Sequence, residues 1–331
     1  MRPAAAVVLV LVALGTGCGE APTSDLAAVL DALPQEEPDT TLVESDDSTP
    51  TPTTTAARRE CERSELATRS LVPTGDELGG DAIAAIRERG RLRVGLDENT
   101  LGFAARDPRT GDIEGFEVEL AEAIAARIFG GDGAQHVETV PVVTNDKLSL
   151  VEAGHVDMTI SANSMSCQRW ERVAFSTEYY TAHQQFLVRR EAAITSVDDL
   201  ARATVCVTTN SSSIGILEEH VPGVIILQVP DRTGCLLLLQ EGDVDAYFGH
   251  DSFLYGMIQQ DPTMVIRDLL PPEVTVSHYG IAVSHDHPEL VRFVNAVLEE
   301  LRNDGTWADL HEDLERIGVP AAEPPPARYR D

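Results

Sequence analysis

The sequence predicts an α/β protein built from two lobes of similar plan, and three patterns carry this prediction. Apolar residues alternate in RLRVGLD (residues 91–97), as they do along a β-strand. In GFEVELAEAIAARIFGG (residues 115–131) apolar residues recur every four positions on one helical face, and a pair of glycines ends the helix. Two stretches share one pattern, the end of a helix followed by a glycine and a strand: LVEAGHVDMTIS (residues 150–161) and LQEGDVDAYFG (residues 239–249). Strands that alternate with helices favour largely parallel sheets, and the echo indicates two lobes.

The C-terminal part reads as two helices followed by a tail. PELVRFVNAVLEELRNDG (residues 288–305) opens on a proline, carries an apolar stripe and ends on a glycine, as helices commonly do. WADLHEDLERIG (residues 307–318) predicts a second helix. We expect residues 319–331 to be a disordered tail.

The N-terminus resembles a secretory signal of the bacterial lipoprotein type. One arginine precedes a run of about a dozen apolar residues, which is shorter than the ~20 that a transmembrane helix needs. Small residues then lead to Cys18, which we expect to carry the lipid. The lipoprotein pattern has leucine three positions before the cysteine, whereas this chain has Gly15 there and Leu14 one position further back. An ordinary cleaved signal is the alternative. The expected location is extracytoplasmic, lipid-anchored to the outer face of the cytoplasmic membrane.

Composition separates a tether from the folded part. The segment after Cys18 is acidic and rich in proline and threonine, and it has no basic residue before Arg58. It cannot bury enough apolar surface to fold, so we expect a disordered tether. The whole chain of 331 residues has a net charge of −30, which argues against nucleic acid as a partner. The charge favours a protein that binds small molecules or a specific protein partner.

Besides Cys18 the chain has four cysteines, and an even number in an exported protein favours two disulfides. Four cysteines allow three pairings, and their spacing alone does not choose among them.

Six short motifs follow one another along the chain in the same order as in one protein family. They are VGLD, GFEVEL, VDMTISANSMSCQRWERVAFSTEYY, VDAYFGHDS, HYGIAV and LRNDGTWADL, spread over about residues 88–318. With them the chain resembles the polar amino acid-binding proteins of ABC importers (solute-binding protein family 3). More narrowly, it is similar to actinobacterial lipoproteins that bind glutamate or glutamine.

The resemblance implies a fold of the type II periplasmic-binding-protein kind. Two α/β lobes are then joined by two crossing strands, near residues 184–188 and 278–283, and the ligand lies in the cleft between the lobes. The expected division of the chain is a signal peptide at 1–17, the tether at 18–58, an N-terminal segment held to lobe 1 at 59–90, lobe 1 at 91–187, lobe 2 at 188–277, a return to lobe 1 at 278–318 and a tail at 319–331.

The resemblance also assigns the two charged groups of an amino acid ligand. Arg169 and Ser164 would hold the α-carboxylate, and a guanidinium suits this role because it is always charged and offers two parallel donors. The α-ammonium would be held by the backbone carbonyl of Ser161 or Ala162 and by the carboxylate of Asp251. From the residues alone, Arg169 could equally be a solvated charge on a capped surface helix, and Asp251 a turn residue.

The second lobe is expected to contribute a loop, VTTNSSS (residues 207–213). In relatives this loop bonds the ligand carboxylate and usually carries glycine and threonine, whereas here Ser211 and Ser212 would donate. His250 is expected to line the pocket, and its alternative is an exposed histidine at a strand end.

Two cues to the ligand's side chain conflict. Lys147 lies where binders of acidic amino acids place a basic residue, which favours glutamate or aspartate. Asp97 lies where a glutamine binder uses an acid to accept from the side-chain amide. Thr100 stands where glutamine binders often have an aromatic residue, which weakens the second cue. Each charge could also be an ordinary surface charge.

The related lipoproteins carry a disulfide similar to a Cys206–Cys235 pair, which leaves Cys61 to bond with Cys167. The second bond would join the N-terminal segment to the lip of the site that carries Arg169.

The resemblance implies capture of a polar, acidic amino acid (glutamate, aspartate or their amides) and its delivery to an ABC permease. The alternative is a sensor that presents the same ligand to a membrane receptor. We expect a monomer with no cofactor, no metal and no enzymatic activity, since the sequence has no Gly-x-Ser-x-Gly, phosphate-loop or HExxH motif.

Overall fold

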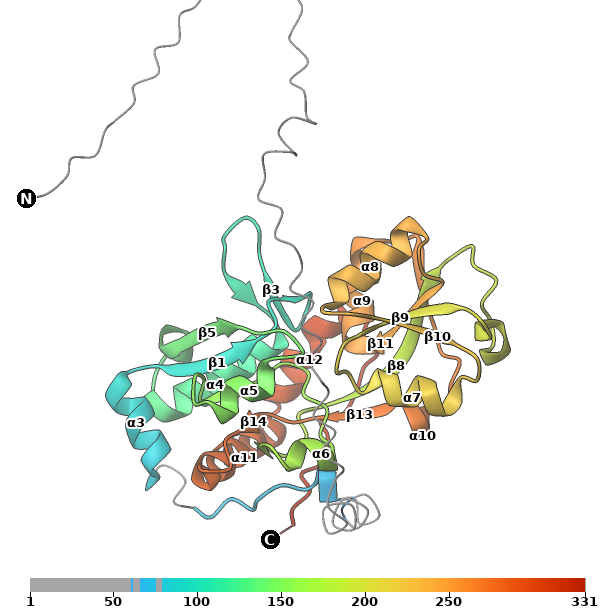
Figure 1. The fold of residues 1–331 in the computed structure, drawn as a ribbon. Helices are drawn as coiled ribbons and strands as arrows, with labels where there is room; N and C mark the ends of the chain where they lie inside the picture. Colours follow the sequence, from blue (N-terminus) through green and yellow to red (C-terminus); the bar gives the residue numbers. More distant parts are fainter. Residues whose placement is uncertain (1–60, 62–65, 76–78, 331) are drawn as a thin grey trace, which may run out of the picture. The chain divides into compact units, whose positions relative to one another are not determined.

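The computed structural model describes residue 61 and residues 66–75 and 79–330 (Figure 1). The expected signal peptide, the lipidated Cys18 and the tether lie outside the described residues. In the described part, no helix is both long enough and apolar enough to cross a membrane.

Lobe 1 is built on a five-stranded sheet in the order β5-β1-β6-β14-β7. These strands are β5 (Val137–Pro141), β1 (Leu92–Leu96), β6 (Met158–Thr159), β14 (Ala282–Val283) and β7 (Ala174–Phe175). Strand β1 runs parallel to β5 and β6, whereas β14 runs antiparallel to β6 and β7. The alternation predicted at residues 91–97 is therefore a central strand of the lobe.

Helices pack around this sheet and share one hydrophobic core with it (Figure 1). They are α3 (Asp81–Arg89), α4 (Phe116–Phe129), α5 (Lys147–Glu152), α6 (Cys167–Trp170), α11 (Pro288–Asp304) and α12 (Thr306–Glu315). A small sheet of β2 (Asn99–Thr100), β3 (Ala104–Arg106) and β4 (Ile113–Glu114) precedes α4, and short 3-10 helices lie at η1 (Leu66–Thr68) and η3 (Gly133–His136).

Lobe 2 is built on the second sheet, in the order β10-β9-β11-β8-β12. These strands are β10 (Ile225–Val229), β9 (Thr204–Thr208), β11 (Ala246–His250), β8 (Tyr180–Arg189) and β12 (Met264–Arg267). The helices of the lobe are η4 (Val197–Leu200), α7 (Ser213–His220), α8 (Arg232–Glu241), α9 (Asp251–Gln260) and α10 (Pro272–Thr275). Strands β10, β9 and β11 are mutually parallel, and two separate apolar clusters form on this sheet.

Two antiparallel strands connect the lobes. The start of β8 pairs with β13 (Val276–Tyr279), with Tyr180 opposite Tyr279 and His183 opposite Val276. From Gln184 onward β8 pairs with β11, inside lobe 2. The crossing of the first strand therefore lies about four residues before the expected residues 184–188, because β8 is long enough to serve both the connection and the second sheet.

The C-terminal segment differs from the expectation of disorder. The Ser70 amide donates to the Arg328 carbonyl at 2.9 Å, and the Arg330 amide donates to the Ser70 carbonyl at 3.0 Å. The Arg330 guanidinium lies 3.7 Å from the centre of the Trp170 ring, and the Tyr329 hydroxyl donates to Glu299. Composition does not reveal these tertiary contacts, which give the proline-rich segment backbone partners and an aromatic surface.

The structure contains the two disulfides that the resemblance implied. Cys206 in β9 is joined to Cys235 in α8, and both are fully buried. Cys61 is joined to Cys167 at the first residue of α6, with the two Cα atoms 6.0 Å apart. The second bond connects the N-terminal segment to the turn that carries Arg169.

Glu117 in the first turn of α4 fixes the backbone where the chain leaves β6. Its Oε1 accepts from the Ala162 amide at 2.7 Å and from the Tyr179 hydroxyl. Ala162 has a φ of 47°, a left-handed conformation that is uncommon for alanine and needs such support. Burial raises the pKa of Glu117 from 4.5 to about 7, against the opposing effect of its two hydrogen bonds.

We expect this carboxyl to make stability depend on pH. The folded protein keeps the proton up to about pH 7, whereas the unfolded chain loses it near 4.5, so the stabilisation is full below 4.5 and is lost as pH rises through 7. Between about pH 5.5 and about pH 8, the free energy of unfolding should fall by ~2 kcal/mol more in the parent than in Glu117→Gln. Urea unfolding at a series of pH values measures both slopes. Equal slopes would contradict the assignment.

Candidate functional site

Most of the site residues expected from the sequence line a small cavity between the lobes. Its volume is about 20 Å³, room for about one water molecule and too little for an amino acid, so an amino acid reaches this space only when the lobes separate. From lobe 1 the lining residues are Thr144, Lys147, Ala162, Ser164 and Arg169, and from lobe 2 they are Thr208, Ser211, Ser212, Ser213, Arg232, Tyr247, Gly249, His250 and Phe253.

Arg169 and Ser164 form one wall of the cavity. The Ser166 hydroxyl caps α6 by accepting from the Arg169 amide at 3.2 Å, and the guanidinium Nη1 donates to the Ser164 carbonyl at 2.9 Å. The hydroxyl of Ser164 accepts from the Ser277 hydroxyl at 2.8 Å. Burial lowers the pKa of Arg169, yet a guanidinium stays charged at any physiological pH. These contacts hold a fixed cation at the cavity.

Lys147 is the only lysine in the sequence, and it is buried with 4% of its surface exposed. Its Nζ donates to the Ser161 carbonyl at 2.8 Å and lies 3.3 Å from the Ala162 carbonyl. Burial, followed by the nearby Arg169 and Arg232, lowers the pKa of Lys147 well below its ordinary value. The two carbonyls that the resemblance assigned to the ligand ammonium are thus bonded to an amine of the protein itself.

Arg232 is a second guanidinium of the site, and sequence reasoning missed it. It is 6% exposed, its Nη2 lies 2.7 Å from Asp97 Oδ2, and its guanidinium lies 3.6 Å from the centre of the Phe253 ring. It begins α8 directly after the capping Asp231, past the carboxyl end of β10. That position was a usable signal, because ligand sites in α/β folds gather at the carboxyl ends of parallel strands.

Asp97 and Thr100 contact the site through Arg232. Asp97 follows β1 and accepts from the guanidinium and from the Asn99 amide at 3.1 Å. Thr100 accepts a hydrogen bond from Nη1 of Arg232. Neither residue lines the cavity, and both connect lobe 1 to lobe 2 through the same guanidinium.

His250, the last residue of β11, lines the cavity. Its Nε2 lies 3.4 Å from the hydroxyl oxygen of Ser164. Burial, then Lys147, Arg169 and Arg232, lowers the pKa of His250 well below 6.5, so this imidazole is neutral. Asp251 instead lines a separate pocket of about 240 Å³ together with Tyr180 and His183, and burial raises its pKa to about 7. The cavity lining therefore contains no carboxylate.

The loop after β9 supplies hydroxyl groups from lobe 2. Asn210 adopts a left-handed φ of 57° and donates from its amide side chain to Asn145 of lobe 1. Ser212 accepts from Gln184 at 3.0 Å. The Ser211 hydroxyl is buried and, among the described residues, has no hydrogen-bond partner, although it lines the cavity. It is a donor whose partner would be a bound ligand.

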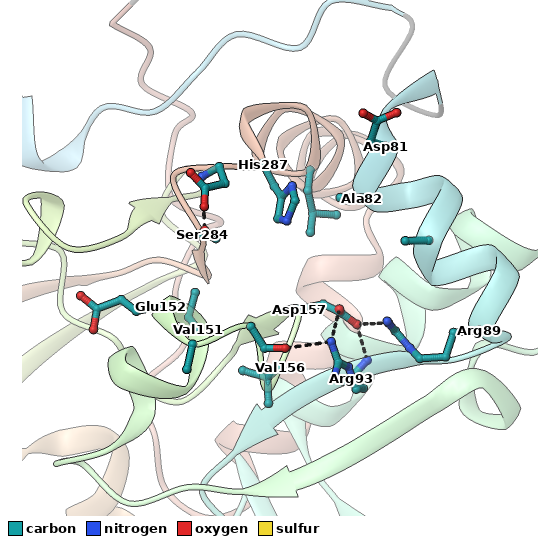
Figure 2. A pocket seen from close by; sticks show the side chains of 15 residues that line it. Asp81, Ala82, Arg89, Arg93, Val151, Glu152, Val156, Asp157, Ser284 and His287 are labelled. Atoms are coloured by element: carbon teal, nitrogen blue, oxygen red, sulfur yellow. Dashed lines mark hydrogen bonds and ion pairs between the residues drawn. The ribbon is translucent and has the colours of Figure 1, made fainter.

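A larger pocket of about 560 Å³ lies elsewhere in lobe 1, and none of the expected site residues lines it (Figure 2). Asp157 there bonds the guanidinium groups of Arg89 and Arg93 and accepts from the Arg93 amide at 2.8 Å. Both guanidinium groups of this pocket are thus paired with Asp157, and the expected site residues lie at the cavity between the lobes, which is the candidate site. Within the described residues, no group of three or more His, Cys, Asp or Glu is placed to hold a metal ion.

Comparisons with known proteins identify the family of the chain. Residues 92–313 match the family model of bacterial extracellular solute-binding proteins, family 3. The chain is 26% identical over 233 residues to the glutamine-binding protein GlnH of Bacillus subtilis, which covers 70% of this chain and 84% of that protein. It is 29% identical over 252 residues to the glutamate-binding protein GluB of Corynebacterium glutamicum, covering 74% of this chain and 85% of that protein.

Among solved structures, a mutant of ArgBP from T. maritima superposes with a TM-score of 0.63 at 28% identity, covering 71% of this chain and 99% of that chain. These relatives are solute-binding receptors and not enzymes. Since the family model spans well over half of the sequence, the chain belongs to the bacterial extracellular solute-binding proteins, family 3.

Proposed function

We propose that this protein captures a small acidic amino acid, glutamate or aspartate, outside the cytoplasmic membrane and delivers it to an ABC permease. The observation that supports this most is the charge of the site. Two guanidinium groups, those of Arg169 and Arg232, and the buried amine of Lys147 lie at a cavity whose lining contains no carboxylate. The names of the relatives GlnH and GluB support a ligand of this size.

In this proposal Arg169 holds the main carboxylate. Its guanidinium is fixed by the Ser164 carbonyl and offers further donors toward the cavity. The unpartnered hydroxyl of Ser211 adds a donor from lobe 2, so the same carboxylate would join both lobes. Ser212 stands next to it at the start of α7.

The second carboxylate would be held by Arg232 and Lys147. In the structure the carboxylate of Asp97, in lobe 1, forms an ion pair with the guanidinium of Arg232, with an N–O distance of 2.7 Å. A ligand carboxylate can replace Asp97 without changing the kind of bond, because both are carboxylates on a planar guanidinium. Lobe separation at β8 and β13 breaks the Asp97 contact and makes the exchange feasible.

The location and the anchor complete the proposal. Family membership supports an extracytoplasmic location, and Cys18 would carry the lipid that keeps the protein at the membrane. The permease would then receive the ligand from a binding protein held close to it.

Loss of Arg169 should abolish tight binding. Isothermal titration of the whole chain with glutamate and aspartate should show at least ~100-fold weaker binding for Arg169→Ala, because truncating one partner of a buried charge pair costs about 2–5 kcal/mol. Arg172→Ala is the matched control: Arg172 is three residues away and pairs with the exposed Glu152, so affinity should stay within about twofold. Parent-like binding by Arg169→Ala would refute the site.

Ligand binding should also raise the pKa of Lys147. The amine faces Glu117, Asp97, Arg169 and Arg232, and an added carboxylate favours its charged form. Affinity should therefore be full below the pKa of Lys147 in the free protein and fall as pH rises through it.

Because Lys147 is the only lysine, a protein labelled with ¹⁵N-lysine gives one side-chain signal, which follows the titration directly. The midpoint should lie well below that of an exposed lysine and should move up when glutamate is added. A midpoint that saturating glutamate leaves in place would show that Lys147 does not respond to the ligand.

A further inference from the structure

We propose that the site recognises two carboxylates of its ligand and does not recognise an ammonium group, so that dicarboxylates without an amino group, such as glutarate and 2-oxoglutarate, belong to its ligand class. The inference rests on the proposed function, because it concerns the same cavity. Three observations carry it, and each concerns a group that an α-ammonium would need.

First, Lys147 already uses the backbone carbonyls that converge at the end of β6. Its Nζ lies 2.8 Å from the Ser161 oxygen and 3.3 Å from the Ala162 oxygen. The left-handed backbone of Ala162, supported by Glu117, sets the orientation of these oxygens. An incoming ammonium would have to displace the protein's own amine from them.

Second, the acids near the cavity are bound elsewhere. Asp251 lines the other pocket, and its Oδ1 accepts from the Ser252 amide at 2.7 Å. Asp97 accepts from Arg232 and from the Asn99 amide. Glu117 accepts from the Ala162 amide and from Tyr179, and it is not part of the lining. A ligand ammonium would therefore be desolvated without a carboxylate partner, which is costly.

Third, the charged side chains at the cavity are mainly positive, so they repel the ammonium group of a ligand. Lys147, Arg169 and Arg232 face the cavity, and Asp97 balances one of them. His250 completes this wall as a neutral imidazole that adds no charge. One ligand carboxylate balances the remaining guanidinium charge and a second favours the charged form of Lys147, whereas the ammonium of an amino acid adds positive charge.

The competing arrangement is that Asp97 turns to the ligand. When a ligand carboxylate takes over Arg232, the released Asp97 would be free to accept from an α-ammonium. In that case the amino group would contribute strongly to affinity, and removing it from the ligand would be costly.

Matched ligands distinguish the two arrangements without any mutation. Isothermal titration of the whole chain compares glutamate with glutarate and 2-oxoglutarate, and aspartate with succinate. One of the two amino acids, glutamate or aspartate, will bind more tightly. For that amino acid, we expect the matched dicarboxylate to have a Kd no more than ~10-fold higher. A dicarboxylate weaker than this, or binding restricted to glutamine or arginine, overturns the inference while leaving an amino acid receptor in place. If no ligand binds, the proposed function itself fails, and the inference with it.

Lys147→Met supplies a second readout. Removing the amine frees the carbonyls of Ser161 and Ala162 for a ligand ammonium, so the Kd ratio of glutarate to glutamate should rise by at least ~10-fold, whatever happens to overall affinity. Arg172→Ala, which leaves these carbonyls untouched, should keep the parent's ratio. An unchanged ratio in Lys147→Met would overturn the role given to Lys147.

Discussion

The antiparallel pairing of β13 with the start of β8 determines where everything else in the site can lie. Four residue pairs, from Tyr180–Tyr279 to His183–Val276, join the lobes. On one side the chain enters the sheet of lobe 1, and on the other β8 continues into lobe 2 beside β11. The ends of β1 and β6 then face the ends of β9, β10 and β11 across the connection. Polar residues placed just after these strands are brought together even though they are far apart in sequence.

Much of the fold followed from the sequence, because periodicity and glycine stops are local signals. Residues 91–97 are β1, and the stripe in residues 115–131 is α4. Arg169 and Ser164 followed from a motif after β6, and the structure places both at the cavity. The position of Asp251 shows the limit of such reasoning. Asp251 begins α9, one residue past the end of β11, and lines another pocket, whereas His250 lines the cavity.

Other features depended on contacts that no local pattern encodes. The position of Arg232 after a strand could have marked it as a site residue, but its burial depends on the Phe253 ring and on Asp97 of the other lobe. Lys147 lines the cavity, and its bonds to two carbonyls depend on the unusual backbone of Ala162. The C-terminal segment looks disordered by composition and gains its order from Ser70 and Trp170. Each case is a tertiary contact that overrides a local preference.

The site is a positively charged region within an acidic molecule of net charge −30. At physiological salt, charges on the outer surface act over only about 8 Å, whereas buried groups are screened much less. An anionic ligand close to the cavity therefore responds mainly to Lys147, Arg169 and Arg232.

The disulfide between Cys61 and Cys167 also has a mechanical consequence. The described chain begins with a covalent link to α6 in lobe 1, and Trp170 in the same helix donates to the Ala67 carbonyl at 2.8 Å. Whatever holds the chain upstream of Cys61 therefore holds lobe 1 directly and lobe 2 only through β8 and β13. If the chain is attached upstream of Cys61, a separation of the lobes would leave lobe 1 in place relative to that attachment and would move lobe 2.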